Sequence, residues 1–144
     1  MKKIGLASDH AGYEMKEFLV GYLDSLGYDI FDFGCYSPER CDYPDFGHPL
    51  AEAVAKKEVD AGIALCGSGV GMSMTVNRHN GVRGALCWDE ELAGLCRQHN
   101  DANILVLPAR FVDNTTAAKM TDKFFATQFE GGRHVERIAK IDIK

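Results

Sequence analysis

The alternation of short apolar segments with longer amphipathic ones predicts an α/β protein, a Rossmann-like three-layer sandwich around a five-stranded parallel sheet. Two features carry this prediction. Five apolar segments have the length of buried strands, at residues 3–7, 28–33, 61–65, 82–86 and 104–107. The segments between them have helical periodicity, and strands that are separated by helices form a parallel sheet covered on both faces.

The helices are predicted from the spacing of their apolar residues. After the first strand, Met15, Leu19 and Leu23 recur every four residues, and Gly27 is placed to end that helix. Residues 34–45 contain two prolines and are expected to form a loop. Further helices are expected at residues 49–57, from the glycine-rich turn to about 77, at 90–99 and at 114–125. We expect one domain over residues 1–144, with a C-terminal helical tail at 130–144.

The bulk composition limits the classes of function. With 46% hydrophobic and 26% charged residues, the 144-residue chain is typical of globular proteins, and its net charge of −5 argues against nucleic-acid or anionic-membrane binding. The five cysteines are odd in number and form no Cys-x-x-Cys pair, which argues against a disulfide framework or a zinc knuckle. No apolar run approaches the about 18 residues of a membrane span or resembles a signal peptide, so we expect a cytoplasmic protein.

The most informative segment is the glycine-rich turn CGSGVG at residues 66–71, between the third strand and the next helix. Backbone N–H groups at such a turn can hold an anion or a developing oxyanion. The spacing excludes the dinucleotide fingerprint, because Met72 stands where that motif needs glycine or alanine, and the Gly-Lys-Ser/Thr ending of a Walker loop is absent. A tight turn that merely needs glycine would give the same pattern, so both interpretations stay open.

The position of Cys66 favours the functional interpretation. Most buried cysteines are inert small hydrophobes, and we expect this of Cys35, Cys87 and Cys96. Cys66 instead stands at a strand end beside a helix N-terminus, which favours the thiolate. Enediolate chemistry requires a base that removes the proton alpha to a carbonyl and donors that hold the oxyanion. The segment therefore predicts a proton-transfer site.

Further polar residues occur near the ends of predicted strands, where doubly wound folds bind their ligands. These candidates are Asp9, His10, Tyr43 and Arg110, together with His99 and Asn100 just before the fifth strand. Taken alone, Asp9 is explained as a helix N-cap and Asn100 as a helix C-cap. Their joint occurrence at matching strand ends favours a shared site.

The C-terminal tail contains a candidate anion site. Arg133 and Arg137 are four residues apart, so a helix would present both on one face, and the planar guanidinium suits phosphate oxygens. A solvated terminal helix is the alternative explanation. Gly131 and Gly132 would allow the tail to leave the body and contact a partner subunit.

Five segments resemble those of the type B ribose-5-phosphate isomerases, in a family that also includes galactose-6-phosphate isomerase. They are SDHAGYEMK near the start, DYPDF at 42–46, CGSGVGMS at 66–73, RQHNDANIL at 97–105 and EGGRHVERI at 130–138. The resemblance runs from end to end. It implies an aldose–ketose isomerase that interconverts ribose 5-phosphate and ribulose 5-phosphate without a metal or an organic cofactor. It also implies a homodimer or tetramer whose sites combine residues of two subunits.

The resemblance implies roles for the candidate residues. The catalytic groups would be Cys66, His99, Asp9 and Ser68, with Cys66 as the base that moves a proton between C1 and C2 and His99 as an aid to ring opening. The oxyanion donors would be Gly67, Ser68, Gly69, Val70 and Gly71. The sugar would contact Tyr43, Asp9 and Asn100. The phosphate would be bound by His10, Arg133 and Arg137, with His134 and Arg110 nearby.

Two other functions stay open at this point. One is isomerisation of allose 6-phosphate or another sugar, since one more carbon needs only modest room. The other is a non-catalytic sensor that binds a sugar phosphate through Arg133 and Arg137 without needing Cys66. The presence of Cys66, His99 and both tail arginines favours ribose 5-phosphate over galactose 6-phosphate.

Overall fold

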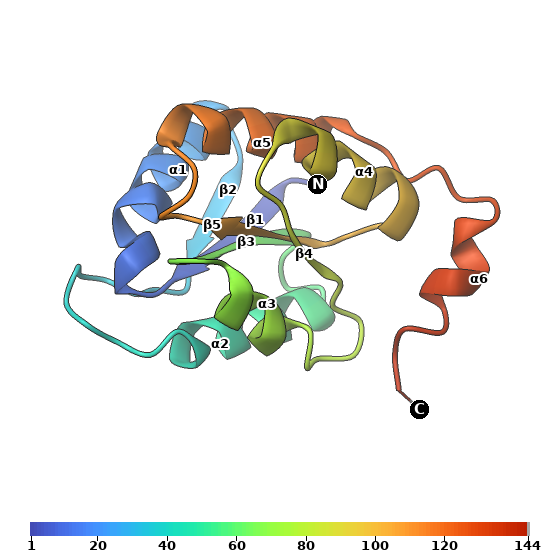
Figure 1. The fold of residues 1–144 in the computed structure, drawn as a ribbon, viewed down its shortest axis with the longest axis horizontal. Coiled ribbons are helices and arrows are strands. Elements are labelled where there is room, and N and C mark those ends of the chain that lie inside the picture. The colour runs from blue at the N-terminus through green and yellow to red at the C-terminus, as the bar shows by residue number, and fades with distance from the viewer. Residues whose placement is uncertain (144) are drawn as a thin grey trace.

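The computed structural model describes residues 1–143 and confirms the predicted α/β sandwich (Figure 1). The strands are β1 (Lys3–Ser8), β2 (Asp29–Asp32), β3 (Ala61–Cys66), β4 (Gly84–Leu86) and β5 (Ile104–Pro108). All neighbours pair in parallel, in the order β2-β1-β3-β5-β4. The chain moves outward from β1 to β2 and then crosses to β3 and the other half of the sheet. The order therefore reverses between β1 and β3, and a ligand crevice is expected at their carboxyl ends.

Helices cover both faces of the sheet. They are α1 (Tyr13–Ser25), α2 (Pro44–Ala55), α3 (Val70–Val76), α4 (Glu90–Asn100), α5 (Asn114–Ala126) and the short α6 (His134–Ile138), with a 3-10 turn at His10–Gly12. In Figure 1, α1, α4 and α5 lie on one face and α2 and α3 on the other, while α6 lies beyond the side of the sheet. Among residues 1–143, no helix is long and apolar enough to cross a membrane.

Two hydrophobic cores, one on each face, hold the layers together. Along β3 the side chains alternate, so that Ile63 and Leu65 join the core under α1, α4 and α5, whereas Ala64 and Cys66 join the core under α2 and α3. Every residue of β3 is buried, as expected for the central strand of a parallel sheet. This alternation directs the Cys66 side chain toward the layer that contains α3.

The start of α2 differs from the prediction. The helix begins at Pro44, not at residue 49, and the predicted loop is correspondingly shorter. Pro44 occupies the first helical turn, where its missing N–H costs nothing because that group has no intrahelical acceptor. Pro49 lies inside the helix and leaves only the bond to the carbonyl of Asp45 unmade. Tyr43 is thereby placed at the N-cap rather than in the middle of a loop.

The tail after α5 is fastened to the body at both of its ends. The Glu130 N–H donates to the Gln98 carbonyl at 3.1 Å. Further along, the Gly81 N–H donates to Asp142 Oδ2, and the Asn80 side-chain amide donates to the Ile143 carbonyl, each at 2.9 Å. The tail thus returns onto its own chain at the end of α4 and at the turn before β4.

Candidate active site

A cavity of about 630 Å³ opens at the carboxyl ends of β1 and β3, where the strand order reverses. The Asp9 N–H donates to the Leu65 carbonyl at 3.2 Å and so ties the two strand ends together. The cavity collects most of the residues that the sequence singled out, namely Asp9, His10, Tyr43, Cys66, Gly67, Ser68, Val70, Gly71 and Arg110. It also includes Met74 and Phe111, which no sequence pattern distinguished from ordinary apolar residues.

Cys66 is the last residue of β3 and only 4% of its surface is exposed, yet it lines the cavity. Its carbonyl accepts the Ala109 N–H at 2.9 Å, so the backbone at this strand end is held by the segment that follows β5. Within the described part of the chain, the Cys66 thiol makes no hydrogen bond. The thiol is therefore held in place by the backbone and remains available to a ligand.

The loop after Cys66 offers backbone donors to the cavity. Gly69 has φ of 77° and is the N-cap of α3, a left-handed conformation that glycine adopts without strain. The Ser68 hydroxyl accepts the Val70 N–H at 3.2 Å. The N–H groups of Ser68 and Gly69 donate to no acceptor in residues 1–143. Unpaired donors at a strand-to-helix turn are suited to an anionic oxygen.

Gly71 allows Tyr43 to approach the same helix. A Cβ atom at position 71 would lie 2.5 Å from Tyr43 Cζ and 2.6 Å from Cε1, well inside van der Waals contact. The phenol ring therefore rests directly on the α3 backbone. Tyr43 is 37% exposed and forms a wall of the cavity.

Asp9 and His10 follow β1 and are both fixed by backbone groups. Asp9 Oδ1 accepts the N–H groups of Ala11 and Gly12 at 3.0 and 3.1 Å, so the residue caps the 3-10 turn and also lines the cavity. His10 Nδ1 lies 3.3 Å from both the N–H and the carbonyl oxygen of Cys41, so the backbone of the loop before α2 holds the imidazole in place. Burial raises the pKa of the neighbouring Cys41 thiol to about 11, so it stays protonated at neutral pH.

Arg110 brings a positive charge to the glycine-rich loop. The Arg110 backbone N–H donates to the Gly67 carbonyl at 3.0 Å. The guanidinium lies beside Gly67, where an added Cβ atom would be 3.1 Å from Nη1. The cavity thus contains a cation from the segment after β5 and an imidazole from the segment after β1. Both suit an anionic ligand.

Gly69 is not among the lining residues of the first cavity, and the other predicted residues line a second cavity of about 400 Å³, namely His99, Asn100, Arg133, His134 and Arg137. The expectation that His99 and Asn100 lie with Cys66 at matching strand ends is wrong. Since α4 runs back between two parallel strands, its last residues lie at the amino-terminal edge of the sheet, just before β5. In Figure 1 the start of α3 and α6 accordingly lie on opposite sides of the molecule.

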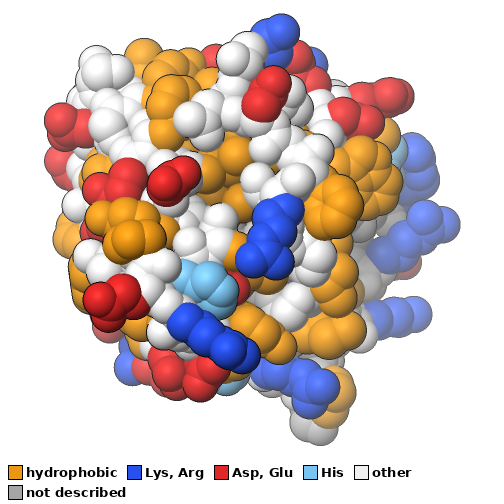
Figure 2. Space-filling view, turned by 60° about the vertical axis from the view of Figure 1, so that its left-hand side comes forward, with side chains coloured by type: hydrophobic (Ala, Val, Ile, Leu, Met, Phe, Trp, Pro, Cys, Tyr) orange, Lys and Arg blue, Asp and Glu red, His pale blue; other side chains and the backbone are white. Residues whose placement is uncertain are grey.

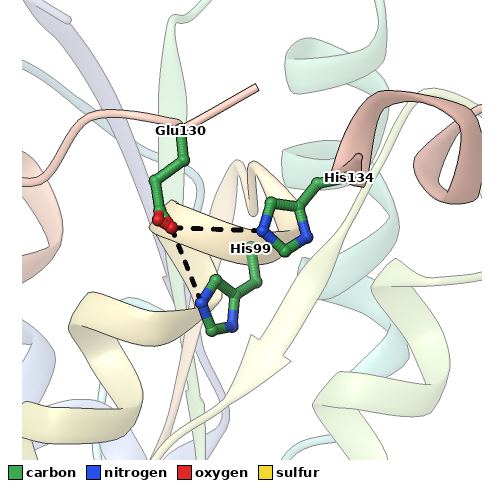
Figure 3. A group of neighbouring side chains, drawn as sticks. All are labelled: His99, Glu130 and His134. Atoms are coloured by element: carbon green, nitrogen blue, oxygen red, sulfur yellow. Dashed lines mark ion pairs between the residues drawn. The ribbon is translucent and has the colours of Figure 1, made fainter. Parts of the chain in front are cut away.

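Two histidines and a glutamate are in contact in this second cavity (Figure 3). The rings of His99 and His134 stack with centroids 4.7 Å apart. Glu130 Oε1 lies 3.7 Å from His99 Nε2 and 4.0 Å from His134 Nε2. Loss of hydration lowers the pKa of His134, and the charge of Arg133 lowers it further. Sequence reasoning missed Glu130, and only its spacing of four residues from His134 hinted at the contact.

Large apolar side chains are exposed around the first cavity. Val70, Met74 and Phe111 line it, and Trp88 lies in an adjoining hollow with Phe111. Figure 2 turns the side of the molecule with the start of α3 forward and shows hydrophobic side chains interspersed with acidic and basic ones and a histidine. Exposed apolar side chains that gather in one place are typical of a surface that another molecule covers.

Comparison with known proteins identifies the family of the chain. The model of the family described as Ribose/Galactose Isomerase matches residues 4–141. The chain belongs to this family. It is 42% identical over 141 residues to ribose-5-phosphate isomerase B of Escherichia coli (strain K12), covering 98% of this chain and 95% of that protein. Membership of the ribose/galactose isomerases makes the chain a sugar phosphate isomerase.

Solved structures of family members have the same fold. A ribose 5-phosphate isomerase from Thermotoga maritima is 48% identical, with a TM-score of 0.96 over 98% of this chain and 97% of its own. Ribose-5-phosphate isomerase B from Mycoplasma genitalium, solved with bound ribulose-5-phosphate, is 42% identical, with a TM-score of 0.93 over 96% and 93% of the two chains. The predicted family and fold are thereby confirmed.

Proposed function

We propose that the chain interconverts ribose 5-phosphate and ribulose 5-phosphate, with Cys66 as the base. The observation that carries this proposal is the position of the Cys66 thiol, buried in the cavity beside the unpaired N–H groups of Ser68 and Gly69. A base and an oxyanion-binding loop next to one another are the two requirements of enediolate chemistry. The activities for which the Escherichia coli and Thermotoga maritima relatives are named support the choice of sugar.

The proposed reaction begins with the open-chain aldose. The Cys66 thiolate removes the proton from C2, the electron pair forms the C1–C2 double bond, and the C1 carbonyl becomes an oxyanion held by the loop N–H groups. Asp9, which lines the same cavity, passes a proton from O2 to O1. The thiol then returns its proton to C1, which leaves the C2 carbonyl of the ketose. Each loop donor is expected to contribute about 10²–10³-fold to the rate.

The phosphate and ring-opening groups are proposed to come from a second copy of the chain. His99, Asn100, Arg133 and Arg137 line a cavity that shares no residue with the Cys66 cavity. Each chain thus carries two incomplete half-sites, and a two-fold pair would complete both. The exposed side chains of Val70, Met74 and Phe111 at the Cys66 cavity supply an apolar surface for this contact.

The first experiment measures ribulose 5-phosphate formation from ribose 5-phosphate, with chelator and no added metal, by the wild type, Cys66→Ala and Cys96→Ala. Cys96 is the matched control because it lies on α4 and is buried in the core on the opposite face of the sheet. We expect turnover in the wild type and Cys96→Ala and none in Cys66→Ala. Retained turnover in Cys66→Ala would contradict the assigned base. A folded wild type that is active only on allose 6-phosphate would make that sugar the substrate in place of ribose 5-phosphate. A wild type that binds sugar phosphates but turns none over would support the non-catalytic sensor.

The second experiment tests the shared site by co-expressing Cys66→Ala with Arg137→Ala. At ribose 5-phosphate concentrations well below the raised KM of Arg137→Ala, each variant alone should be nearly inactive. In random pairs about half are mixed, and each mixed pair has one intact site of two, so about a quarter of wild-type turnover should return. If each site lay within one chain, mixing would restore nothing.

A further inference from the structure

The cluster in Figure 3 has the composition of a metal site. One ring nitrogen of His99, a carboxylate oxygen of Glu130 and one ring nitrogen of His134 all lie within 4.8 Å of one another. They come from the end of α4, the connecting segment and the start of α6, and Glu130 Oε1 lies within 4.0 Å of a nitrogen of each ring. Imidazole nitrogen and carboxylate oxygen are the ligands that Zn²⁺ and its first-row neighbours take in proteins.

The spacing is close to what an ion requires. Bonds of about 2.0–2.1 Å in tetrahedral geometry separate neighbouring ligand atoms by about 3.3 Å. The distances of 3.7 Å from Glu130 Oε1 to His99 Nε2 and of 4.0 Å to His134 Nε2 exceed this by less than an ångström. His99 and Glu130 have side chains that are 40% and 46% exposed, so His99 is free to turn out of its stack on His134 and Glu130 is free to move toward the ion. The Glu130 backbone is already tied to Gln98 beside His99.

His134 supplies an independent indication of a ligand. It is 6% exposed, and its Nε2 is a buried polar atom with no hydrogen-bond partner in residues 1–143. Such an atom normally costs free energy unless something satisfies it. Nε2 faces Glu130 at a distance too long for a hydrogen bond, which leaves room for an ion between them.

We propose that His99, Glu130 and His134 bind a divalent transition-metal ion such as Zn²⁺, and that the ion inhibits the isomerase. Three protein ligands leave one position open to water. Inhibition rests on the proposed function, because a coordinated His99 cannot assist ring opening. Ion binding itself does not depend on it.

Two arginines beside the proposed ion site should weaken ion binding through their positive charge. Arg133 and Arg137 line the same cavity and repel a cation, so the ion must be held by coordination and not by the local field. Removing one positive charge by Arg137→Ala should therefore tighten ion binding several-fold. The same change should weaken phosphate binding.

A matched control is provided by a second histidine pair. His48 Nδ1 and His79 Nε2 are hydrogen-bonded at 2.7 Å, on α2 and on the turn after α3. In the described part of the chain, no third ligand atom joins them within the 4.8 Å of the first cluster. His48→Asn thus removes a histidine without touching the proposed site.

The test is a Co²⁺ titration of chelator-treated full-length protein, followed by the visible absorption of four-coordinate Co²⁺ and by displacement with Zn²⁺. We expect one ion per chain, binding weakened about tenfold or more in Glu130→Gln and His134→Asn, and unchanged binding in His48→Asn. Glu130→Gln and His134→Asn each remove one proposed ligand, so if one variant misfolds, the other still tests the site. Unchanged Co²⁺ binding in the folded variant, loss in His48→Asn, or a thiolate–Co²⁺ charge-transfer band would overturn the proposal.

Inhibition is measured separately with ribose 5-phosphate. Zn²⁺ should abolish turnover by the wild type and by His48→Asn, and a chelator should restore it. Co²⁺ binding by a chain that does not turn over ribose 5-phosphate would refute the proposed substrate but not the ion site. Turnover of ribose 5-phosphate by a chain that does not bind Co²⁺ would refute the ion site but not the proposed substrate.

Discussion

Replacing Gly71 with alanine separates the position of the Tyr43 ring from the stability of the fold. The added Cβ atom would lie 2.5 Å from Tyr43 Cζ, whereas ordinary van der Waals contact begins at 3.4 Å. The ring must therefore move by about 0.9 Å. Since Tyr43 is 37% exposed, it can swing outward without disturbing either hydrophobic core.

The expected effects on stability and activity differ in size. Alanine is favoured over glycine by about 1 kcal/mol within a helix, which offsets the lost ring contacts, so the free energy of unfolding should change by about 1 kcal/mol or less. By contrast, a displacement of about 1 Å in a group that positions the substrate costs up to about 10²-fold. We expect kcat/KM for ribose 5-phosphate to fall about 10–100-fold in Gly71→Ala.

The assay pairs urea unfolding with steady-state kinetics, and Gly21→Ala serves as control. Gly21 lies in α1, where an added Cβ atom would meet no other atom within 4 Å, so this change should stabilise the protein by about 1 kcal/mol and leave kcat/KM unaltered. Adding Tyr43→Ala to Gly71→Ala should cost no more than Tyr43→Ala alone. A folded Gly71→Ala variant with wild-type kcat/KM would refute the reasoning.

Three further changes test the phosphate site, the core and an ionised carboxylate. Arg137→Ala should raise KM much more for ribose 5-phosphate than for free ribose, and an equal effect on both would count against a phosphate role. Phe124→Ala should lower the free energy of unfolding by about 3–5 kcal/mol in urea titrations, because this ring is fully buried. The backbone N–H groups of Lys3 and Lys2 donate to the Asp60 carboxylate and lower its pKa, so Asp60→Asn should be less stable than the wild type at pH 7. Urea unfolding should show this difference at pH 7 and its loss as the pH falls below about 3.9 and through the lowered pKa.

The sheet was predictable because its strands are buried on both faces. Such strands appear in the sequence as uninterrupted apolar runs, and β3 and β5 match their predicted segments to within one residue. Helix starts were less certain where proline occurs. Pro44 indicated a loop and Pro49 indicated the start of the helix, yet proline is tolerated in the first turn of a helix, and α2 begins at Pro44 and continues through Pro49.

The first cavity was predictable from topology, whereas the second was not. Residues at or just after the carboxyl ends of β1, β3 and β5 must meet at one edge, and Asp9, Cys66 and Arg110 do so. His99 precedes a strand, and the direction of α4 alone should have assigned it to the opposite edge. The approach of Glu130 to His134 depends on a turn between α5 and α6 that no periodic pattern specifies.

The separation of the two cavities follows from the fold. A helix that connects parallel strands returns to the edge from which the chain started, so residues at its end cannot reach the switch point within the same copy. The tail packs at that edge, where hydrogen bonds to Gln98 and Asn80 and the Gly81–Asp142 hydrogen bond hold it. A two-fold pair is the smallest assembly in which each Cys66 could face Arg133 and Arg137 of the other copy. Disrupting the Gly81–Asp142 contact should then lower turnover at a cavity in the other copy, although neither residue lines the Cys66 cavity.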